Sequence, residues 1–387
     1  MITLRTACTL EIDEPDVAAS DILEQLDLDP HRLSRCVGLV ACHADFISSG
    51  GLKAVCERLP FDVVGTTTLA AATEKAADLE ILTVTVLTSD TAEFSAVLTD
   101  SLAEDQEIPI QTALEKAEKQ LSGRPALVLA YAPLLQNVGG ERLVKLISRA
   151  SGGVPVFGTL TCDHNFDFHD ARVIFNGEAY GDRMALVLLS GPVRCRFLTI
   201  SVPERKAEKQ NAIITASEGN VVTHINGLPF LDYLESIGLT RDAGLEGAKY
   251  IPVILDYNDG TPPVARCFYL ISPDGSAVCG GEMPEGATFA LSSMDAEDVI
   301  LSAKQILERV LAMENADGML IMSCIVRSIT LGVDQLAEAR QVGDILAGSL
   351  PYQLCYSGGE MCPVCQTGGS TANRFHNFSF AICLFEG

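Results

Sequence analysis

The sequence repeats one pattern three times: an apolar stretch, a loop with glycine, an amphipathic stretch, and a second apolar stretch ending in small polar residues. The three endings read "DVVGTTTLAA" at 62–71, "VPVFGTLTCD" at 154–163 and "PYQLCYSGGE" at 351–360. An apolar run, a turn and then 3.6-residue periodicity predict a strand that is joined through a helix to a second strand. Three such units indicate mixed sheets with helices packed against them.

Further strands are predicted after the first two units. Residues 79–89 and 93–99 alternate apolar and polar side chains, and 171–177, 184–190 and 194–201 follow the second unit in the same way. The simplest explanation is a duplicated strand–helix–strand–strand–strand unit, near 36–100 and again near 125–201. We therefore predict a mixed α/β (α+β) fold in two lobes, with mixed sheets flanked by helices.

A change in composition divides the chain. With 387 residues it is longer than one ordinary core needs, and a polar, charged segment begins at residue 202. We place the boundary there, between a region at 1–205 and a region at 206–387. The second region is predicted to hold short strands, a helix at 295–312 with Asp295 as its N-cap, the third unit, and a final strand at 375–385. A helix at 112–125 is predicted between the first two units.

The charge balance excludes some partners. The chain carries 27 basic and 51 acidic residues, a net charge of −24. Nucleic acids and anionic membranes bind through lysine and arginine, so neither partner is expected. Most of the 13 cysteines lie in apolar stretches, which predicts buried free thiols rather than a disulfide framework. No signal peptide and no membrane-spanning stretch is predicted, so we expect a cytoplasmic protein.

An ordered set of short motifs resembles the FIST proteins. In the first region these are "VVGTTTLA" (63–70) and "VPVFGTLTCD" (154–163). The second region contributes "VTHINGLPFLDYL" (222–234), "SPDGSAVCGGEMPEG" (272–286), "MSCIVR" (322–327), "YSGGEM" (356–361) and "FHNFSF" (375–380). The resemblance implies FIST N-terminal and C-terminal domains. It also implies a sensory, signal-transduction role, small-molecule ligands, amino acids among them, and a signalling protein as partner. No output domain is recognised, so the chain resembles a stand-alone member.

The candidate ligand site combines the repeated turns with buried charge. Strand ends that meet in an α/β sheet commonly form a ligand site, and glycine lets backbone approach a ligand closely. Arginine offers a planar fork for a carboxylate, and a nearby glutamate can pair with it or hold an amino group. An ion pair holding the last strand explains the same two residue types equally well. The candidate ligand contacts are Arg327, Glu360, Arg266, Gly359, Ser357, Tyr356, Asp163, Thr161, His376 and Asn377.

Enzyme and metal motifs are not recognised, so we expect no catalysis, no cofactor and no metal. Cys362 and Cys365 form the one Cys-x-x-Cys pair, and a loop with two incidental thiols explains it better than zinc or redox chemistry. The acidic loop at 162–171 is likewise expected to be solvated. The predicted function is a small-ligand sensor. Two alternatives remain: a protein-interaction scaffold, and an enzyme that uses Cys324 or Cys162.

Overall fold

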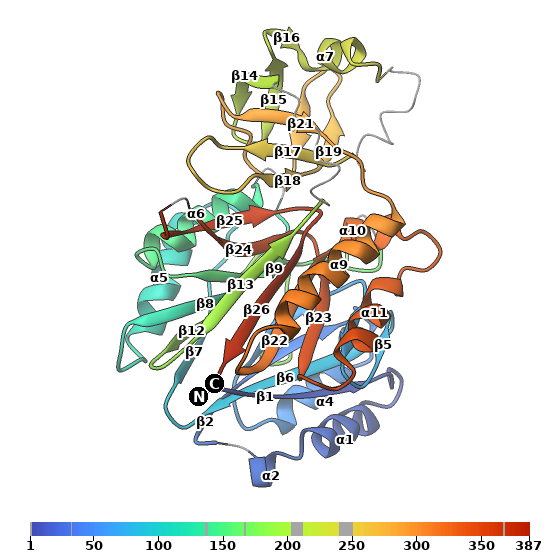
Figure 1. Ribbon diagram of the computed structural model, residues 1–387. Coiled ribbons are helices and arrows are strands. Elements are labelled where there is room, and N and C mark those ends of the chain that lie inside the picture. Colours follow the sequence, from blue (N-terminus) through green and yellow to red (C-terminus); the bar gives the residue numbers. More distant parts are fainter. Residues whose placement is uncertain are drawn as a thin grey trace.

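The computed structural model describes residues 2–31, 33–135, 138–165, 168–202, 212–239, 251–366 and 368–387. It confirms the predicted mixed α/β class. A large body of three sheets and their covering helices carries a smaller lobe of antiparallel strands at one end (Figure 1). We call the smaller part, residues 212–291 as described, the upper lobe.

Each body sheet has strands from more than one part of the chain. The first sheet runs in the order β1 (Thr3–Thr9), β6 (Leu82–Ser89), β2 (Arg35–Cys42), β3 (Val63–Thr67), β10 (Val173–Phe175) and β11 (Glu178–Tyr180). The second runs β25 (Thr371–His376), β24 (Glu360–Cys365), β9 (Val156–Leu160), β8 (Pro125–Ala132), β12 (Ala185–Ser190) and β7 (Glu93–Leu98). The third runs β13 (Cys195–Ile200), β26 (Phe380–Glu386), β22 (Ala316–Cys324), β23 (Tyr352–Ser357), β4 (Ala71–Thr73) and β5 (Ala77–Asp78).

The upper lobe is one antiparallel sheet with a short helix. Its strands are β18 (Val264–Arg266), β17 (Val253–Asp256), β21 (Thr288–Leu291), β14 (Ala212–Glu218), β15 (Val221–Ile225), β20 (Ala277–Cys279) and β19 (Phe268–Ile271), with β16 (Leu228–Pro229) beside β15. The helices of the chain are α1 (Pro15–Leu26), α2 (Leu28–His31), α3 (Asp45–Ser48), α4 (Gly51–Arg58), α5 (Glu107–Glu118), α6 (Gly140–Ala150), α7 (Phe230–Ser236), α9 (Ala296–Leu311), α10 (Ile325–Thr330) and α11 (Ala337–Leu346).

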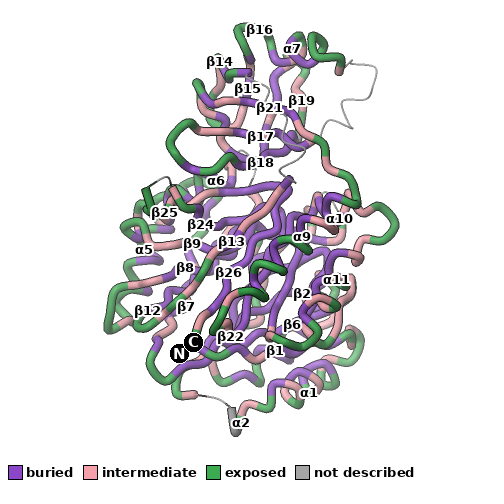
Figure 2. Tube along the Cα trace, in the orientation of Figure 1, coloured by how far each residue is buried: buried purple, intermediate pink, exposed green. Residues whose placement is uncertain are grey.

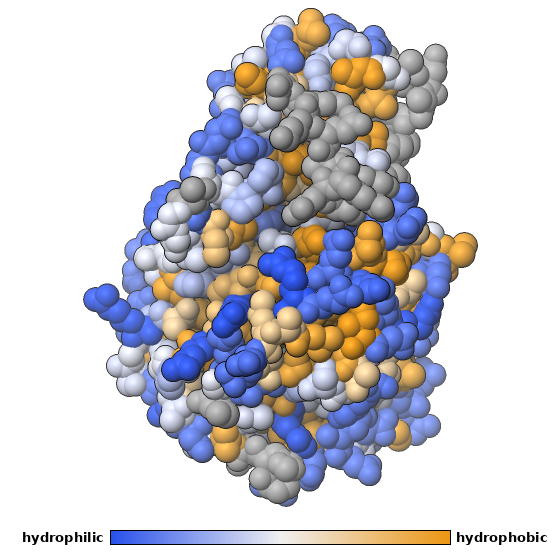
Figure 3. Space-filling model, viewed as in Figure 1, coloured by the Kyte–Doolittle hydropathy of each residue, from blue (hydrophilic) through white to orange (hydrophobic). Residues whose placement is uncertain are grey.

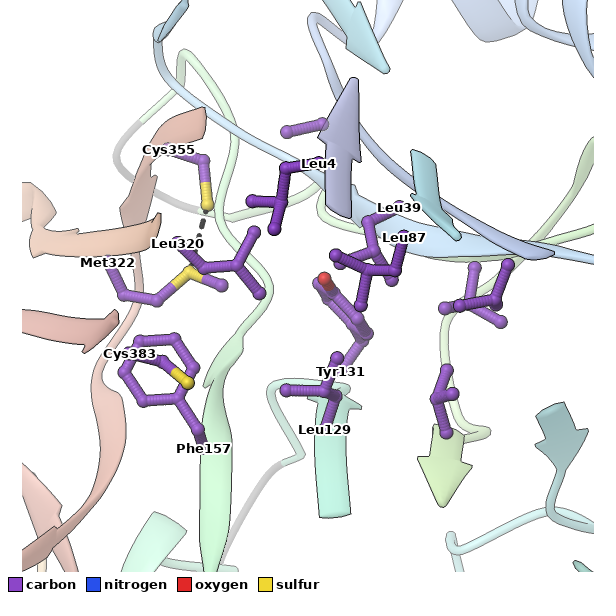
Figure 4. Close-up of a cluster of buried hydrophobic side chains, with 14 of the residues drawn as sticks. Leu4, Leu39, Leu87, Leu129, Tyr131, Phe157, Leu320, Met322, Cys355 and Cys383 are labelled. Carbon is purple, nitrogen blue, oxygen red and sulfur yellow. Dashed lines mark hydrogen bonds between the residues drawn. The ribbon is translucent and has the colours of Figure 1, made fainter. Parts of the chain in front are cut away.

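The three body sheets face one another around a shared core. Leu39, Tyr131 and Met322, one from each sheet, belong to the same buried cluster (Figure 4). Along β2 the odd-numbered Leu39 points into this core, whereas Val40 packs under α1 and α4. Helices α5 and α6 cover the second sheet in the same way, and α9 and α11 cover the third. The strands are therefore buried on both faces, while the outer helix faces remain exposed (Figure 2).

The three repeat units exchange strands in a ring. In each unit the two main strands are parallel: β2 with β3, β8 with β9, and β22 with β23. The strand after the first unit, β4, pairs with β23 of the third; β24 of the third pairs with β9 of the second. The ring closes because β10, from the second unit, pairs with β3 of the first. We call this arrangement the strand ring.

Several predicted elements need correction. Helix α5 ends at Glu118, well before the predicted end at Gly123 and Pro125, and begins five residues earlier than predicted. The predicted final strand at 375–385 is two strands, β25 and β26, separated by Asn377–Ser379. The pair Cys362 and Cys365 lies in strand β24, not in a loop. Strand β1 and helix α1 were not predicted. Asp295 caps α9 as predicted, with a capping box to Asp298.

The predicted boundary at 205/206 falls in residues 203–211, which lie outside the described residues, and it stays a prediction. Strand pairing crosses that boundary, because β24 lies beside β9 and β23 beside β4. The described segment 296–387 therefore belongs to the body and not to the upper lobe.

Candidate ligand-binding site

The three repeated turns meet, as the sequence analysis expected. Thr68 Oγ1 donates to the Tyr356 carbonyl at 2.8 Å, and Thr67 Oγ1 donates to the Cys162 carbonyl at 2.8 Å. The backbone N–H of Leu160 donates to the Gly359 carbonyl at 2.9 Å. The turns are fully buried. Their polar groups thus bond to one another across the strand ring, and the backbone N–H of Leu160 is already engaged.

Arg327 is buried in α10 and pairs with Glu338 of α11. Its NH2 nitrogen lies 2.5 Å from Glu338 Oε1, and its Nε donates to the same oxygen at 3.0 Å. The guanidinium also donates to Ser302 Oγ at 3.0 Å and to the Val299 carbonyl. Glu338 accepts a further bond from Ser323 Oγ. Arg327 therefore joins α9, α10 and α11, and its ion pair is with Glu338 and not with Glu360.

Arg266 is equally buried, at the base of the upper lobe. Its NH2 nitrogen lies 2.8 Å from Glu141 Oε2, on α6, and 2.5 Å from the Tyr257 hydroxyl. Its NH1 nitrogen donates to the Phe375 carbonyl in β25. The Arg266–Glu141 pair, completely removed from solvent, links the upper lobe to the second body sheet.

Glu360 begins β24 and is fully buried without an ion-pair partner among the described residues. Its Oε2 accepts from Ser379 Oγ at 2.6 Å, whereas Oε1 has no hydrogen-bond partner there. Burial raises the pKa of Glu360 to about 8, and the Ser379 hydroxyl, the Ser357 hydroxyl and the more distant Arg327 charge lower it only in part. The carboxyl is therefore uncharged at neutral pH and carries a proton that it can donate.

Asn377 lies in the break between β25 and β26, where the upper lobe meets the body. Its backbone N–H donates to the Ala265 carbonyl of the lobe. A Cβ placed on Gly280 would lie 2.4 Å from Asn377 Oδ1, and one on Gly359 would lie 3.2 Å from Nδ2. Neither side-chain amide atom has a hydrogen-bond partner in the part of the chain that the structure describes. The amide thus lies between a glycine of the lobe and a glycine of the body.

We call Glu360, Asn377, Ser379, Gly280 and Gly359 the junction site. Cys324, at the start of α10, belongs to the same region: its backbone N–H donates to the Ser379 carbonyl, and burial, together with the nearby Glu360 and Cys267 side chains, raises the pKa of its thiol. Buried polar atoms without partners are uncommon in folded proteins, and a set of them at one place indicates a site for water or a ligand.

The other predicted contacts occupy more ordinary positions. Ser357 Oγ bonds to Thr159 Oγ1 at 2.6 Å and accepts from the Gly359 N–H. The Tyr356 hydroxyl points to the α11 side and donates to the Gln335 carbonyl. His376 is buried with Nε2 3.1 Å from the Cys362 carbonyl, and burial lowers its pKa to about 3. Its imidazole is therefore neutral.

Asp163 and Thr161 follow the second unit. Asp163 accepts from the backbone N–H groups of Asn165 and Asp170, which fixes its loop; residues 166 and 167 of that loop lie outside the described residues. Thr161 Oγ1 is buried and has no hydrogen-bond partner among those described. The described residues contain no group of three or more histidine, cysteine or acidic side chains that could hold a metal ion.

Four residues of these contacts were not predicted from the sequence: Glu141, Glu338, Ser379 and Gly280. No local pattern marks Glu141 or Glu338, since each lies in a helix that reads as amphipathic and pairs with a distant arginine. Gly280 did offer a signal: it lies in the quoted motif "SPDGSAVCGGEMPEG" directly after a short strand.

Two surface depressions flank the β24–β25 hairpin. One of about 630 Å³ is lined by Asp256, Asn258, Gly260, Thr261, Pro262, Cys365 and Gln366. The other, of about 420 Å³, is lined by Lys145, Ser148, Arg149, Gly153, Thr371, Ala372, Asn373 and Arg374. Glu360 and Asn377 line neither, because they lie deeper, at the contact of lobe and body.

Comparison with protein families decides the class of the chain. The model of the FIST N domain matches residues 36–228, and that of the FIST C domain matches residues 230–363. The chain belongs to the FIST family. FIST domains are sensory, signal-transduction domains. The two matches account for most of this FIST protein.

Other comparisons give less. No curated protein matches the chain. Among solved structures it is similar to a chorismatase, with 9% identity, a TM-score of 0.33, and 100% of this chain and 99% of that chain covered. It is also similar to a cyanuric acid hydrolase from A. caulinodans, with 10% identity, a TM-score of 0.27, and 49% and 70% covered. In the described part of the FIST protein, no helix has the length and apolar character needed to cross a membrane.

Proposed function

We propose that this FIST protein is a non-catalytic sensory module that binds a small molecule at the junction site. The observation that carries the proposal is the set of buried polar atoms without partners, Glu360 Oε1 and both amide atoms of Asn377. Leaving one such group unpaired costs about 1–3 kcal/mol. A bound molecule that satisfies them regains this free energy, and the family's sensory role supports a ligand.

The position of the site supports signalling as well as binding. Asn377 and Glu360 belong to the body, whereas Gly280 and Arg266 belong to the upper lobe. A molecule that contacts both parts stabilises one arrangement of the lobe on the body relative to others. A partner protein that binds one arrangement more tightly than the other can respond to this change in population. Amino acids, the ligand class implied by the family resemblance, are the first compounds to test.

The cysteines support a binding role over catalysis. Burial raises the pKa of the Cys324 thiol well above its ordinary value, and it raises that of Cys162 as well. A nucleophilic cysteine needs the opposite shift. All 13 cysteines are free, and Cys365 is the exposed one. Free thiols in this number suit a reducing compartment, so we also infer a cytoplasmic location.

A thermal-shift screen tests the proposal. Wild-type protein is melted with the amino acids and a metabolite panel, beside Asn377→Leu and the control Arg340→Ala, whose arginine is half exposed and pairs with Asp334. A ligand at 100 times its Kd adds about 2.7 kcal/mol of stability. We expect one compound class to raise the Tm of wild type and control but not of Asn377→Leu.

Two results would overturn the proposal. The first is the lack of any shift across the panel together with native mass spectra of the protein from its own cells that show no bound molecule. The second is a shift that Asn377→Leu retains in full. In the first case, a partner captured equally well by wild type and Asn377→Leu would favour the scaffold alternative.

A further inference from the structure

We infer that the ligand presents an uncharged donor–acceptor edge, such as a carboxamide, to Glu360 and Asn377. The inference rests on the proposed function and narrows it. It departs from the simplest expectation for a free amino acid, in which an arginine holds the α-carboxylate and a glutamate holds the ammonium group.

The buried positive charges of the described residues already have acidic partners. Arg266 and Arg327 are the fully buried arginines in the described chain, and each already has a buried carboxylate partner. Arg327 directs bonds to Glu338, Ser302 and the Val299 carbonyl, so its donors are used within the helices. A ligand carboxylate at the junction would have to compete with Glu141 or Glu338 for its partner. Burying an unpaired carboxylate is far more costly than burying a neutral group.

The junction site has one acidic side chain, Glu360. Its Oε2 accepts from Ser379 Oγ, Ser357 lies near, and the charge of Arg327 acts on it from farther away. The pKa of Glu360, raised to about 8, leaves the carboxyl neutral at pH 7. An ammonium group would have to displace that proton before it could pair with a carboxylate. A carbonyl oxygen suits that acid, which can donate its proton in a hydrogen bond.

The side-chain amide of Asn377 offers both a donor and an acceptor. Its unpaired atoms are one acceptor, Oδ1, and one NH2 donor, Nδ2, in a single plane. A carboxamide presents the same pair in reverse order, so two amides can form two parallel hydrogen bonds. The junction thus offers a ligand two donors, the Glu360 carboxyl proton and the Asn377 NH2 group, and one acceptor, Asn377 Oδ1. An amide can match all three, because its oxygen has two acceptor lone pairs and its NH2 group has two N–H donors.

Two glycines, Gly280 and Gly359, shape the space around the Asn377 amide. A Cβ on Gly280 would lie 2.4 Å from Asn377 Oδ1 and 2.9 Å from Cys267 Sγ, and one on Gly359 would lie 2.1 Å from Phe375 Cζ. Because both positions are glycine, no Cβ crowds the Asn377 amide between lobe and body. Gly280→Ala should displace the Asn377 amide without removing any polar group. It therefore tests whether ligand binding depends on the position of the amide and not on its presence alone.

Small fluorinated probes test the inference. Trifluoroacetamide, trifluoroacetate and the trifluoroethylammonium ion are each added to the protein at pH 7, and their ¹⁹F line widths are recorded. The proteins are wild type, Asn377→Leu, Gly280→Ala and Arg340→Ala. Wild type and Arg340→Ala should broaden the amide signal at least twofold more than the other two variants, and no protein should broaden the charged probes.

The outcomes separate the inference from the proposed function. Broadening of trifluoroacetate or trifluoroethylammonium that Asn377→Leu abolishes would overturn the uncharged edge and leave a ligand site in place. Amide broadening that persists in both Asn377→Leu and Gly280→Ala would also overturn it. If no probe responds and the thermal-shift panel is equally silent, the junction holds water only, and both proposals fall. Circular dichroism of every variant checks that it is folded.

Discussion

Arg327 and Glu338 illustrate how single buried charges hold this protein together. Both side chains are fully excluded from solvent, and the pair joins three helices over the third sheet. Replacing one partner leaves the other charge buried and unpaired, whereas replacing both leaves an apolar contact. Arg266 and Glu141 hold the upper lobe on the body in the same way.

Arg327→Met should therefore lower the free energy of unfolding by about 3–5 kcal/mol. The double variant Arg327→Met/Glu338→Leu should recover most of that loss. Urea denaturation measures both, and Arg340→Ala, which removes an exposed pair, should stay within about 1 kcal/mol of wild type. Equal losses in the single and double variants would show that the packing of the aliphatic parts of Arg327 and Glu338, and not their charges, determines the free energy of unfolding.

Glu360 gives stability a dependence on pH. Its folded pKa, about 8, lies above the ordinary value of 4.5, so the folded state binds the proton more tightly than the unfolded state does. Below pH 4.5, protonated Glu360 makes its full contribution to the free energy of unfolding. This contribution is lost as the pH rises through 8, by about 1.4 kcal/mol per pH unit. His376, with a pKa of about 3, acts in the opposite direction as the pH falls below 6.5.

Glu360→Gln should remove the Glu360 part of this dependence. Between pH 6.5 and 8, where folded His376 is neutral and its unfolded form loses its remaining charge, the unfolding free energy of the variant should fall less steeply than that of wild type. Chemical denaturation at several pH values provides the measurement. Parallel curves for the two proteins would contradict the raised pKa.

For single side chains, the sequence indicated which residues are unusual but not their partners. Arg327, Arg266 and Glu360 were singled out because they are charges among apolar residues, and all three are buried. Their partners cannot be predicted from the sequence. Glu141 lies 125 positions from Arg266 along the chain, and only the fold brings the two side chains together. Asp295, by contrast, acts within its own helix, and its capping role was predicted correctly.

Among the elements, the parallel strand pairs depend on two glycines. A Cβ on Gly65 would lie 1.8 Å from the Val40 carbonyl oxygen, and one on Gly158 would lie 1.9 Å from the Ala130 carbonyl oxygen. Each glycine lies opposite that residue in its parallel ladder. The same close approach occurs in the first and second units and so belongs to the repeated design.

Gly158→Ala should force β9 away from β8 and destabilise the protein strongly, by about 3 kcal/mol or more. Gly181→Ala is the matched control, because a Cβ there meets nothing within 4 Å, and it should change stability by less than about 0.5 kcal/mol. Thermal unfolding of both variants tests this. A Gly158→Ala protein as stable as the control would mean that the ladder can widen freely.

Element prediction succeeded where the periodicity was regular, including the exchanged strand β10, and missed the exchanged strands β4 and β24. The parallel strands and their helices follow from the pattern. Strand β24 was missed because it follows Gly358 and Gly359 and contains Pro363. Only Glu360 and Met361 of β24 pair with β9, so Pro363 lies beyond that ladder, where its missing N–H does no harm.

For the whole molecule, the strand ring makes the three units depend on one another. Figure 3 shows hydrophilic residues over much of one face, and the apolar side chains of the shared core come from all three sheets. A fragment of residues 1–202 lacks β22, β23, β24 and β26. It leaves β4 and β9 without their partners and exposes the core that Met322 and Cys383 fill.

That fragment should fail to form a native core, despite containing two complete repeat units. We expect weak near-ultraviolet circular dichroism and strong binding of the dye ANS, compared with full-length protein at the same concentration. A fragment with sharp, cooperative unfolding and no dye binding would show that the first region folds independently. The pairing across residue 205 would then be a docking contact between finished domains.

The closed exchange of strands also fixes the number of copies. Open-ended repeat proteins can lengthen by duplication, because each added unit stacks on the last and presents a fresh end. Here every unit gives one strand and receives one, in a cycle that returns to its start. A fourth copy would bring a strand with no acceptor unless the whole circle widened, and the loss of one would leave an acceptor empty. Variation in such a protein is therefore confined to its loops and to the lobe inserted before the third unit.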